Sequence, residues 1–120
     1  MKNEEKDLSP RTKMFARRII RLYCGLSRSD TVAQVLGKQV LRSGTSIGAN
    51  YREANRARSK AEFIAKMGDC LKETDETLYW LELLLEEKII PANKLSALVS
   101  EAGELLAIFI TILKKARGQT

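Results

Sequence analysis

The chain has 120 residues, of which 44% are apolar and 30% charged, and its net charge is +6. This length and composition predict one globular unit and exclude a disordered tail, a collagen-like fibre and a disulfide-rich scaffold. The chain contains no histidine, which excludes histidine bases and histidine-ligated metal sites.

The sequence pattern predicts a flexible arm over residues 1–8, a helical bundle over residues 9–117 and a tail over residues 118–120. No apolar signal region stands at the start, and no unbroken apolar run of about 18 residues occurs. We therefore expect a cytoplasmic protein without membrane contact. Cys24 and Cys70 lack the spacing of a metal or redox motif, so we expect both to be reduced and partly buried.

A first helix is predicted to begin with Ser9 as its cap and Pro10 at the first helical position. It should end between Gly25 and Ser27. Its apolar residues recur at steps of three and four, which is typical of an amphipathic helix; they are Phe15, Ile19, Leu22, Tyr23 and Leu26.

Ser29 or Asp30 is expected to cap a second helix that runs unbroken to about Ala57. The segment Ser43–Gly48 has the composition of a loop, but the helical phase is preserved across it, which favours a continuous helix. Its predicted apolar side carries Val32, Val35, Leu36, Val40, Ile47, Tyr51 and Ala54, and the opposite side carries Lys38, Arg42, Arg52 and Arg56.

Three glycines of this second helix, Gly37, Gly44 and Gly48, share a further stripe. Small residues at this spacing allow another backbone to approach closely. Two interpretations stay open, which are close packing inside the chain and a tight contact between subunits.

Ser59 and Glu62 match a capping box and predict the start of a third helix that runs to about Lys88. Pro91 ends that segment, and Pro91 or Asn93 begins a fourth helix. The expected seam of the third helix is Phe63, Met67, Leu71, Thr74, Leu78, Leu81 and Leu85. The apolar face of the fourth is Leu95, Leu98, Val99, Ala102, Leu105, Leu106, Phe109, Ile110 and Leu113.

No strand pattern competes with these four helices, and short connections make neighbouring helices antiparallel. The predicted fold is therefore all-α, an antiparallel up-down-up-down four-helix bundle. The apolar faces are broader than one bundle core needs, so they predict either a thick core or a self-association surface. The additional residues are Tyr79, Trp80, Leu83, Leu84, Ile108, Ile110 and Ile112.

Charge is distributed unevenly along the chain. Residues 1–60 hold 14 basic and 5 acidic residues, whereas residues 61–120 hold 7 basic and 10 acidic residues. A basic half indicates either a polyanionic partner or a solvated surface. Arginine suits phosphate, and with few aromatic residues nearby we expect contacts to the nucleic-acid backbone rather than base stacking. The candidate nucleic-acid-binding residues are Arg17, Arg18, Arg21, Lys38, Arg42, Arg52 and Arg56; Arg11, Lys13, Arg28, Arg58 and Lys60 also lie on these two helices.

Three segments in order resemble the bacterial 23S rRNA intervening-sequence proteins. They are Arg42–Ala54 (RSGTSIGANYREA), Ser59–Phe63 (SKAEF) and Glu73–Leu81 (ETDETLYWL). The resemblance spans roughly residues 12–116, although this chain has Ala54 where many members have glycine. It implies a homopentameric barrel of four-helix bundles, related to accessory proteins of diversity-generating retroelements, that binds nucleic acid or a nucleic-acid enzyme such as a reverse transcriptase.

A structural role is expected for the polar residues of these segments, which are Ser46, Asn50, Glu53, Glu73 and Glu76. The short polar side chains can bond backbone carbonyls one turn back, and a buried Glu–Arg or Glu–Asn contact between the second and third helices would explain the carboxylates. A hard-ion site made of the three carboxylates is the less favoured alternative.

No nucleophile–base pair or phosphate loop is recognisable, so we expect no enzyme and no cofactor. The predicted function is that of a non-catalytic homo-oligomer that binds nucleic acid, RNA in particular, through the basic face of the first two helices. A protein-interaction scaffold, or an accessory subunit of a nucleic-acid enzyme, is the alternative.

Overall fold

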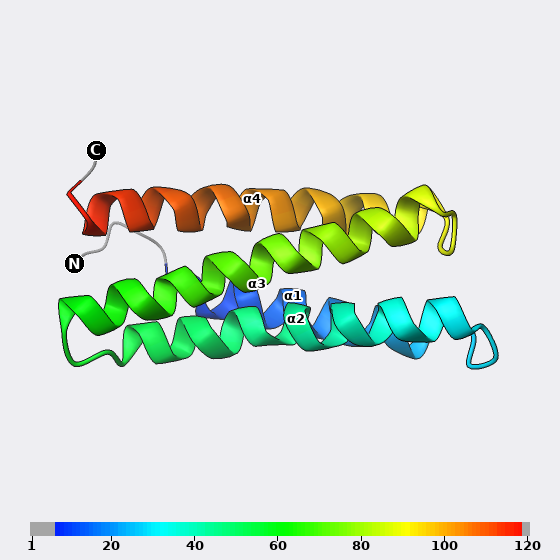
Figure 1. Cartoon of the computed structure of the whole chain (residues 1–120), viewed down its shortest axis with the longest axis horizontal. Helices are drawn as coiled ribbons and strands as arrows, with labels where there is room; N and C mark the ends of the chain where they lie inside the picture. The colour runs from blue at the N-terminus through cyan, green and yellow to red at the C-terminus, as the bar shows by residue number, and fades with distance from the viewer. Residues whose placement is uncertain (1–6, 119–120) are drawn as a thin grey trace.

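The computed structural model describes residues 7–118, and all regular structure in that range is helical. The helices are α1 (Ser9–Cys24), α2 (Thr31–Asn55), α3 (Lys60–Glu86) and α4 (Ala92–Ala116). They lie along one axis in a body of 46 × 22 × 20 Å, and consecutive helices run in opposite directions (Figure 1). The prediction of an up-down-up-down four-helix bundle is confirmed.

Two of the predicted helix caps are confirmed. Asp30 accepts a hydrogen bond from the Ala33 N–H at 3.0 Å and so satisfies a free donor at the start of α2. At the start of α3, Ser59 Oγ accepts from the Glu62 N–H at 3.1 Å, and the Glu62 carboxylate accepts from the Arg58 N–H. These local bonds fix where both helices begin.

The start of α1 differs from the prediction. Leu8, not Ser9, occupies the cap position, and its apolar side chain makes no cap hydrogen bond. Leu8 is buried, and its N–H donates to the Tyr51 hydroxyl at 3.1 Å, so this residue belongs to the bundle core rather than to a free arm. Asp7 Oδ1 accepts from the Ser9 N–H at 3.0 Å. The remaining arm, residues 1–6, lies outside the described residues, as do residues 119–120 of the predicted tail.

The helix α2 continues without a break through Ser43–Gly48, as predicted. The hydroxyl groups of Ser43, Thr45 and Ser46 each donate to the carbonyl oxygen four residues earlier, at 2.7–2.9 Å. The polar side chains of this stretch are therefore satisfied within the helix, which removes their usual tendency to form a turn.

The glycine stripe packs against α1 within the same chain. A Cβ added to Gly44 would lie 2.9 Å from Ile19 Cγ1, and one added to Gly37 would lie 2.4 Å from Leu26 Cδ1. Gly48 faces α1 in the same way. The interpretation as close packing inside the chain is confirmed.

The buried face of α2 agrees with the predicted one at Val40, Ile47, Tyr51 and Ala54 but differs in the first turns of the helix. Val32 and Val35, predicted to be apolar core residues, are 52% and 56% exposed. The face turned inward is built from smaller residues because α1 approaches so closely. The buried residues of α2 are Ala33, Gly37, Val40, Ser43, Gly44, Ile47, Tyr51 and Ala54.

The core stripe of α3 also differs, because this helix packs against both α2 and α4. Cys70, Thr77 and Leu84 are buried. The predicted seam residues Phe63, Leu71, Leu78 and Leu85 are only partly buried. Leu84 is fully buried, which agrees with the thick-core interpretation for this residue.

Both cysteines are free thiols. Cys70 is buried, and burial raises the pKa of its thiol to about 12. Cys24 is exposed, contrary to the predicted partial burial.

The helix α4 is long and apolar enough, by length and composition, to cross a membrane, and only 28% of that apolar window is buried. The sequence predicted no membrane contact because charged residues interrupt this apolar segment. Two carboxylates, Glu101 and Glu104, bond to Arg11 of α1, and Leu105 and Phe109 of the same helix are fully buried in the core. We therefore describe α4 as a bundle helix, in which Ile110 alone of the large apolar side chains is exposed.

Candidate nucleic-acid interface

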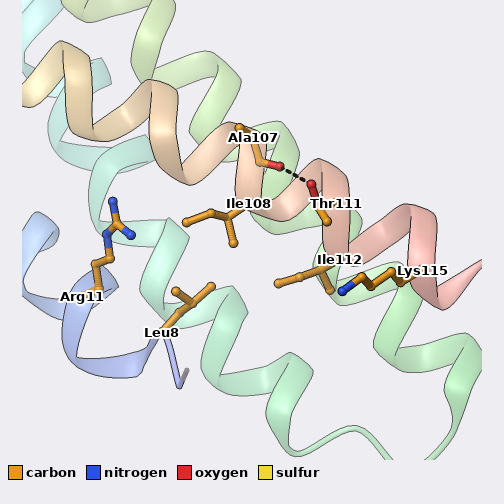
Figure 2. Close-up of a pocket in the computed structure, with 7 residues that line it drawn as sticks. All are labelled: Leu8, Arg11, Ala107, Ile108, Thr111, Ile112 and Lys115. Carbon is orange, nitrogen blue, oxygen red and sulfur yellow. Dashed lines mark hydrogen bonds between the residues drawn. The ribbon is translucent and has the colours of Figure 1, made fainter. Parts of the chain in front are cut away.

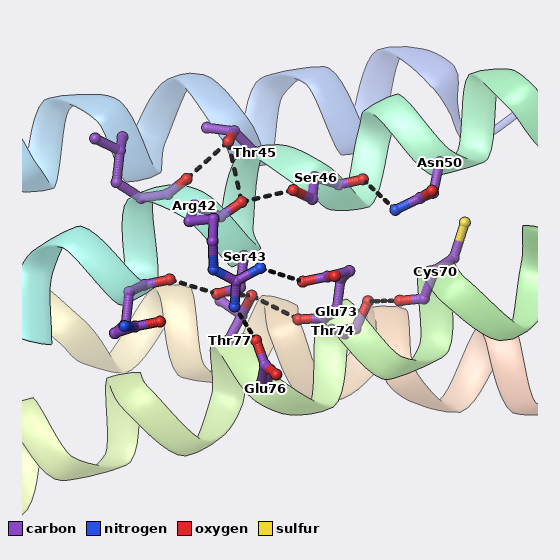
Figure 3. A network of polar contacts seen from close by, with 12 residues as sticks. Arg42, Ser43, Thr45, Ser46, Asn50, Cys70, Glu73, Thr74, Glu76 and Thr77 are labelled. Atoms are coloured by element: carbon purple, nitrogen blue, oxygen red, sulfur yellow. Dashed lines mark hydrogen bonds and ion pairs between the residues drawn. The ribbon is translucent and has the colours of Figure 1, made fainter.

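A network of polar side chains joins α2 to α3 at mid-length (Figure 3). The Arg42 guanidinium bonds Glu73 at 3.2 Å and also bonds Glu76, and both carboxylates raise the pKa of Arg42. The predicted Glu–Arg contact between these helices is therefore found, but it is not buried as predicted, since the Arg42 side chain is 50% exposed. Since its charge is matched by two carboxylates, Arg42 is the candidate binding residue least suited to meet a phosphate.

Inside this network lies a buried pair of hydroxyl groups. Thr77 Oγ1 is 2.8 Å from Ser43 Oγ and 2.7 Å from the Glu73 carbonyl oxygen. Both residues are fully buried. Buried hydroxyl groups are costly unless bonded, so this pair specifies the register between α2 and α3.

The other motif residues bond locally or to α3. Asn50 Nδ2 donates to the Ser46 carbonyl oxygen at 3.0 Å. Glu53 binds Lys66 of α3 at 2.6 Å, and this pairing raises the pKa of Lys66. The five polar motif residues therefore form bonds within α2 or between α2 and α3. Within residues 7–118, no group of three or more carboxylates and thiols is close enough to hold a metal ion.

Two arginines of α1 face α4. Arg11 forms a forked pair with Glu101, at 2.6 and 2.9 Å, and also reaches Glu104 at 2.7 Å. These bonds, and the nearby charge of Arg18, lower the pKa of Glu101. Arg18 is partly buried, and its charge acts on this carboxylate without an ion pair between them.

The remaining cations of α1 and α2 are exposed and form no ion pair or side-chain hydrogen bond with residues 7–118. We call six of them the basic face: Lys13, Arg17, Arg21, Lys38, Arg52 and Arg56. Lys13 was not among the predicted binding residues, although its place one turn before Arg17 on the same helix was a visible signal.

A groove of about 650 Å³ runs between the start of α1 and the end of α2. We call it the α1–α2 groove. Its lining residues are Ser9, Pro10, Thr12, Lys13, Ala16, Thr45, Gly48, Ala49, Arg52, Glu53 and Arg56. Half of the basic face therefore borders one hollow, which the sequence alone did not indicate.

A second groove, of about 380 Å³, is apolar and lies between the start of α1 and the end of α4 (Figure 2). In it, Ile108 and Ile112 of α4 point toward Leu8. Ile110 is 38% exposed outside this groove. These isoleucines, predicted to extend beyond the core, are thus incompletely covered in the single chain.

The comparisons with known proteins agree with the four-helix fold. Residues 4–111 match the family model described as 23S rRNA-intervening sequence protein. A search of curated proteins gave no match. Among solved structures, the chain is similar to a protein of unknown function from the S23 ribosomal protein family of Bacteroides thetaiotaomicron, with 41% identity and a TM-score of 0.82. The match covers 89% of this chain and 98% of that one. The chain therefore belongs to the 23S rRNA intervening-sequence protein family.

Proposed function

We propose that this protein is a non-catalytic homo-oligomer that binds nucleic acid, RNA in particular, through the basic face of α1 and α2. The observation that carries the proposal is the contrast in pairing. Arg11 and Arg42 are neutralised by carboxylates, whereas the six residues of the basic face have no such partner among residues 7–118.

The chemistry of the basic face favours phosphate as its target. Four of its six cations are arginine, whose planar guanidinium matches the geometry of a phosphate group. None of the six is interleaved with an exposed aromatic side chain, because Tyr79 is on α3 and Tyr23 is partly buried. Contacts to the backbone and a steep dependence on salt are therefore expected. Since the family is named for an intervening sequence of 23S rRNA, RNA is the first nucleic acid to test.

The test is a titration of a labelled structured RNA, followed by fluorescence anisotropy at low and high salt. We expect binding at low salt that weakens steeply as salt increases. A variant with Arg17, Arg21, Arg52 and Arg56 changed to glutamate should lose binding by at least about 100-fold, since each phosphate contact contributes independently.

The matched control carries the same change of charge on other exposed cations, namely Lys72, Lys94, Lys114 and Arg117 changed to glutamate. It should retain much more of the affinity. If the wild-type protein does not bind RNA at low salt, or if both variants lose affinity equally, the proposal fails.

Self-association is the second part of the proposal, and incompletely covered isoleucines of α4 support it. Exposed apolar surface generally marks a partner site. Ile110 is exposed on one flank of α4, and Ile108 and Ile112 are only partly covered on the other flank. Light scattering should give a multiple of the 13.5 kDa chain mass, and Ile110→Asp should reduce it. A monomer at micromolar concentration would contradict self-association.

A protein-interaction scaffold is the alternative function, and a feature of α3 favours it. Tyr79 is 54% exposed and, with Leu78, lines a shallow hollow bordered by Asp75, Glu76 and Glu82. An exposed aromatic ring with a polar border is typical of protein contacts. Retention of partner binding in Tyr79→Ser would count against this alternative, because the ring is its main apolar contact.

A further inference from the structure

We propose that the α1–α2 groove is the phosphate-binding subsite of this protein, in which Lys13, Arg52 and Arg56 hold phosphate groups. This inference rests on the proposed function, since it names the part of the basic face where the ligand sits. The chemistry is that of a phosphate chain, which either a nucleic-acid backbone or an inorganic polyphosphate can supply.

The shape of the groove admits such a ligand. Small residues, Ala16, Gly48 and Ala49, form part of its lining. At Gly48 the two helices approach closely, since an added Cβ would lie 3.2 Å from Thr12 Oγ1. The long side chains of the lining are charged ones, so a phosphate group can approach the helices without displacing apolar side chains.

The charge of the groove is positive and uncompensated. Lys13, Arg52 and Arg56 have no ion pair within residues 7–118. The single lining carboxylate, Glu53, is bound at 2.6 Å to Lys66, which does not line the groove. The three cations therefore face the groove with their one acidic neighbour already neutralised.

The neutral donors that line the groove are already used. Thr12 Oγ1 lies 3.0 Å from the Leu8 carbonyl oxygen, to which it donates, and Thr45 Oγ1 donates to the Leu41 carbonyl oxygen at 2.7 Å. The Ser9 N–H donates to Asp7 Oδ1 at 3.0 Å, and the Ser9 hydroxyl also bonds this carboxylate. Recognition is consequently left to the three cations, which select the charge of a phosphate rather than the edges of bases or the hydroxyl groups of sugars.

The experiment compares two triple variants that have the same loss of charge. The first changes the groove residues, Lys13→Gln, Arg52→Gln and Arg56→Gln. The second changes the rest of the basic face, Arg17→Gln, Arg21→Gln and Lys38→Gln. Circular dichroism confirms that each variant retains its helices, and affinity for the labelled RNA is measured at several salt concentrations.

We expect the groove variant to lose more affinity, by about 10-fold or more relative to the other triple. The negative slope of log K against log salt should become shallower by about 2 to 3 in the groove variant, because each lost phosphate contact removes about 0.7–0.9 from its magnitude. If the groove variant keeps its slope while the other triple loses it, the inference is overturned and the proposed function stands.

A second measurement tests the groove without nucleic acid. Inorganic tripolyphosphate is added to the full chain, and the backbone amide signals of Gly48 and Ala49 are followed by NMR. Shifts with both RNA and tripolyphosphate, absent from the groove variant, support the subsite. Shifts with RNA alone support it and assign the phosphate to nucleic acid.

Shifts with tripolyphosphate in a protein that binds no RNA would support the subsite and reject the proposed function. No groove-dependent shift with either ligand would overturn the inference.

Discussion

The two seams that flank this bundle are closed by different means. Between α2 and α3, the buried hydroxyl pair of Ser43 and Thr77 lies beside the ion pairs of Arg42, and the helices are in contact along their length. Between α1 and α4, the two helices are in contact at few positions, one forked arginine joins them, and an apolar groove lies open beside it. The α2–α3 contact is therefore complete within one chain, whereas the α1–α4 contact leaves an apolar groove that a partner can cover.

This difference between the two contacts predicts which substitutions should affect folding and which should affect association. The hydroxyl pair between α2 and α3 is buried, so changes there should affect folding. Ile110 is exposed, and Ile108 and Ile112 are only partly covered, so changes there should affect association more than folding.

The largest expected effect compares two isoleucines. Ile47 of α2 is fully buried, and Ile47→Ala should reduce the free energy of unfolding by about 2–5 kcal/mol, because it leaves a cavity. Ile110 is 38% exposed, and Ile110→Ala should cost under about 1 kcal/mol. Urea unfolding of dilute protein measures both. Equal losses of unfolding free energy would show that Ile110 is part of a core.

The second comparison uses two glycines. Gly44→Ala places a Cβ 2.9 Å from Ile19 Cγ1, and this overpacking should destabilise the protein by about 1–3 kcal/mol. Gly103 of α4 has nothing within 4 Å of the same position, so Gly103→Ala should stabilise the helix by about 0.5–1 kcal/mol. Thermal unfolding reports the sign. A destabilised Gly103→Ala protein would mean that a second copy approaches α4 there.

The third comparison uses two threonines with the same local bond. Thr77 and Thr111 each donate to a carbonyl oxygen one turn back, but only Thr77 also contacts a buried hydroxyl, that of Ser43. Thr77→Val should cost about 1 kcal/mol, and Thr111→Val should stay within about 0.5 kcal/mol of the wild type. If both variants lose a similar free energy of unfolding, the hydroxyl pair does not determine the α2–α3 register.

The smallest effect concerns the α1–α4 ion pair and depends on pH. Arg11→Gln should reduce the free energy of unfolding by no more than about 1 kcal/mol at neutral pH, since the pair is partly exposed. Because Arg11 lowers the pKa of Glu101 below its ordinary 4.5, this contribution is present above pH 4.5 and is lost as pH falls through the lower folded value.

Urea unfolding at pH 7 and well below pH 4.5 checks this sign. The difference between wild type and Arg11→Gln should shrink at acid pH. Arg17→Gln is the control, because Arg17 has no ion pair within residues 7–118, and its difference from the wild type should not follow this profile. A larger Arg11 effect in acid would contradict the assignment.

The sequence by itself determined the number of helices, most of their ends and the continuity of α2. These features depend on interactions within a few residues, such as the caps at Asp30 and Ser59 and the step of three and four between apolar residues. The cap of α1 was mispredicted because Leu8 is held by a distant residue, Tyr51. The family resemblance was likewise readable from three short segments.

Only the tertiary structure decided which faces are buried and which charges are free. A helical pattern gives the angle of a side chain around its own axis but not the positions of the neighbouring helices. That is why Val32 was predicted to face the core, and why the place of Leu84 stayed open between a thick core and an outer surface. Arg42 and Arg52 looked equivalent in sequence, but α3 presents Glu73 and Glu76 to Arg42 alone. Electrostatic pairing depends on distances across the bundle, and these are fixed only when the helices pack.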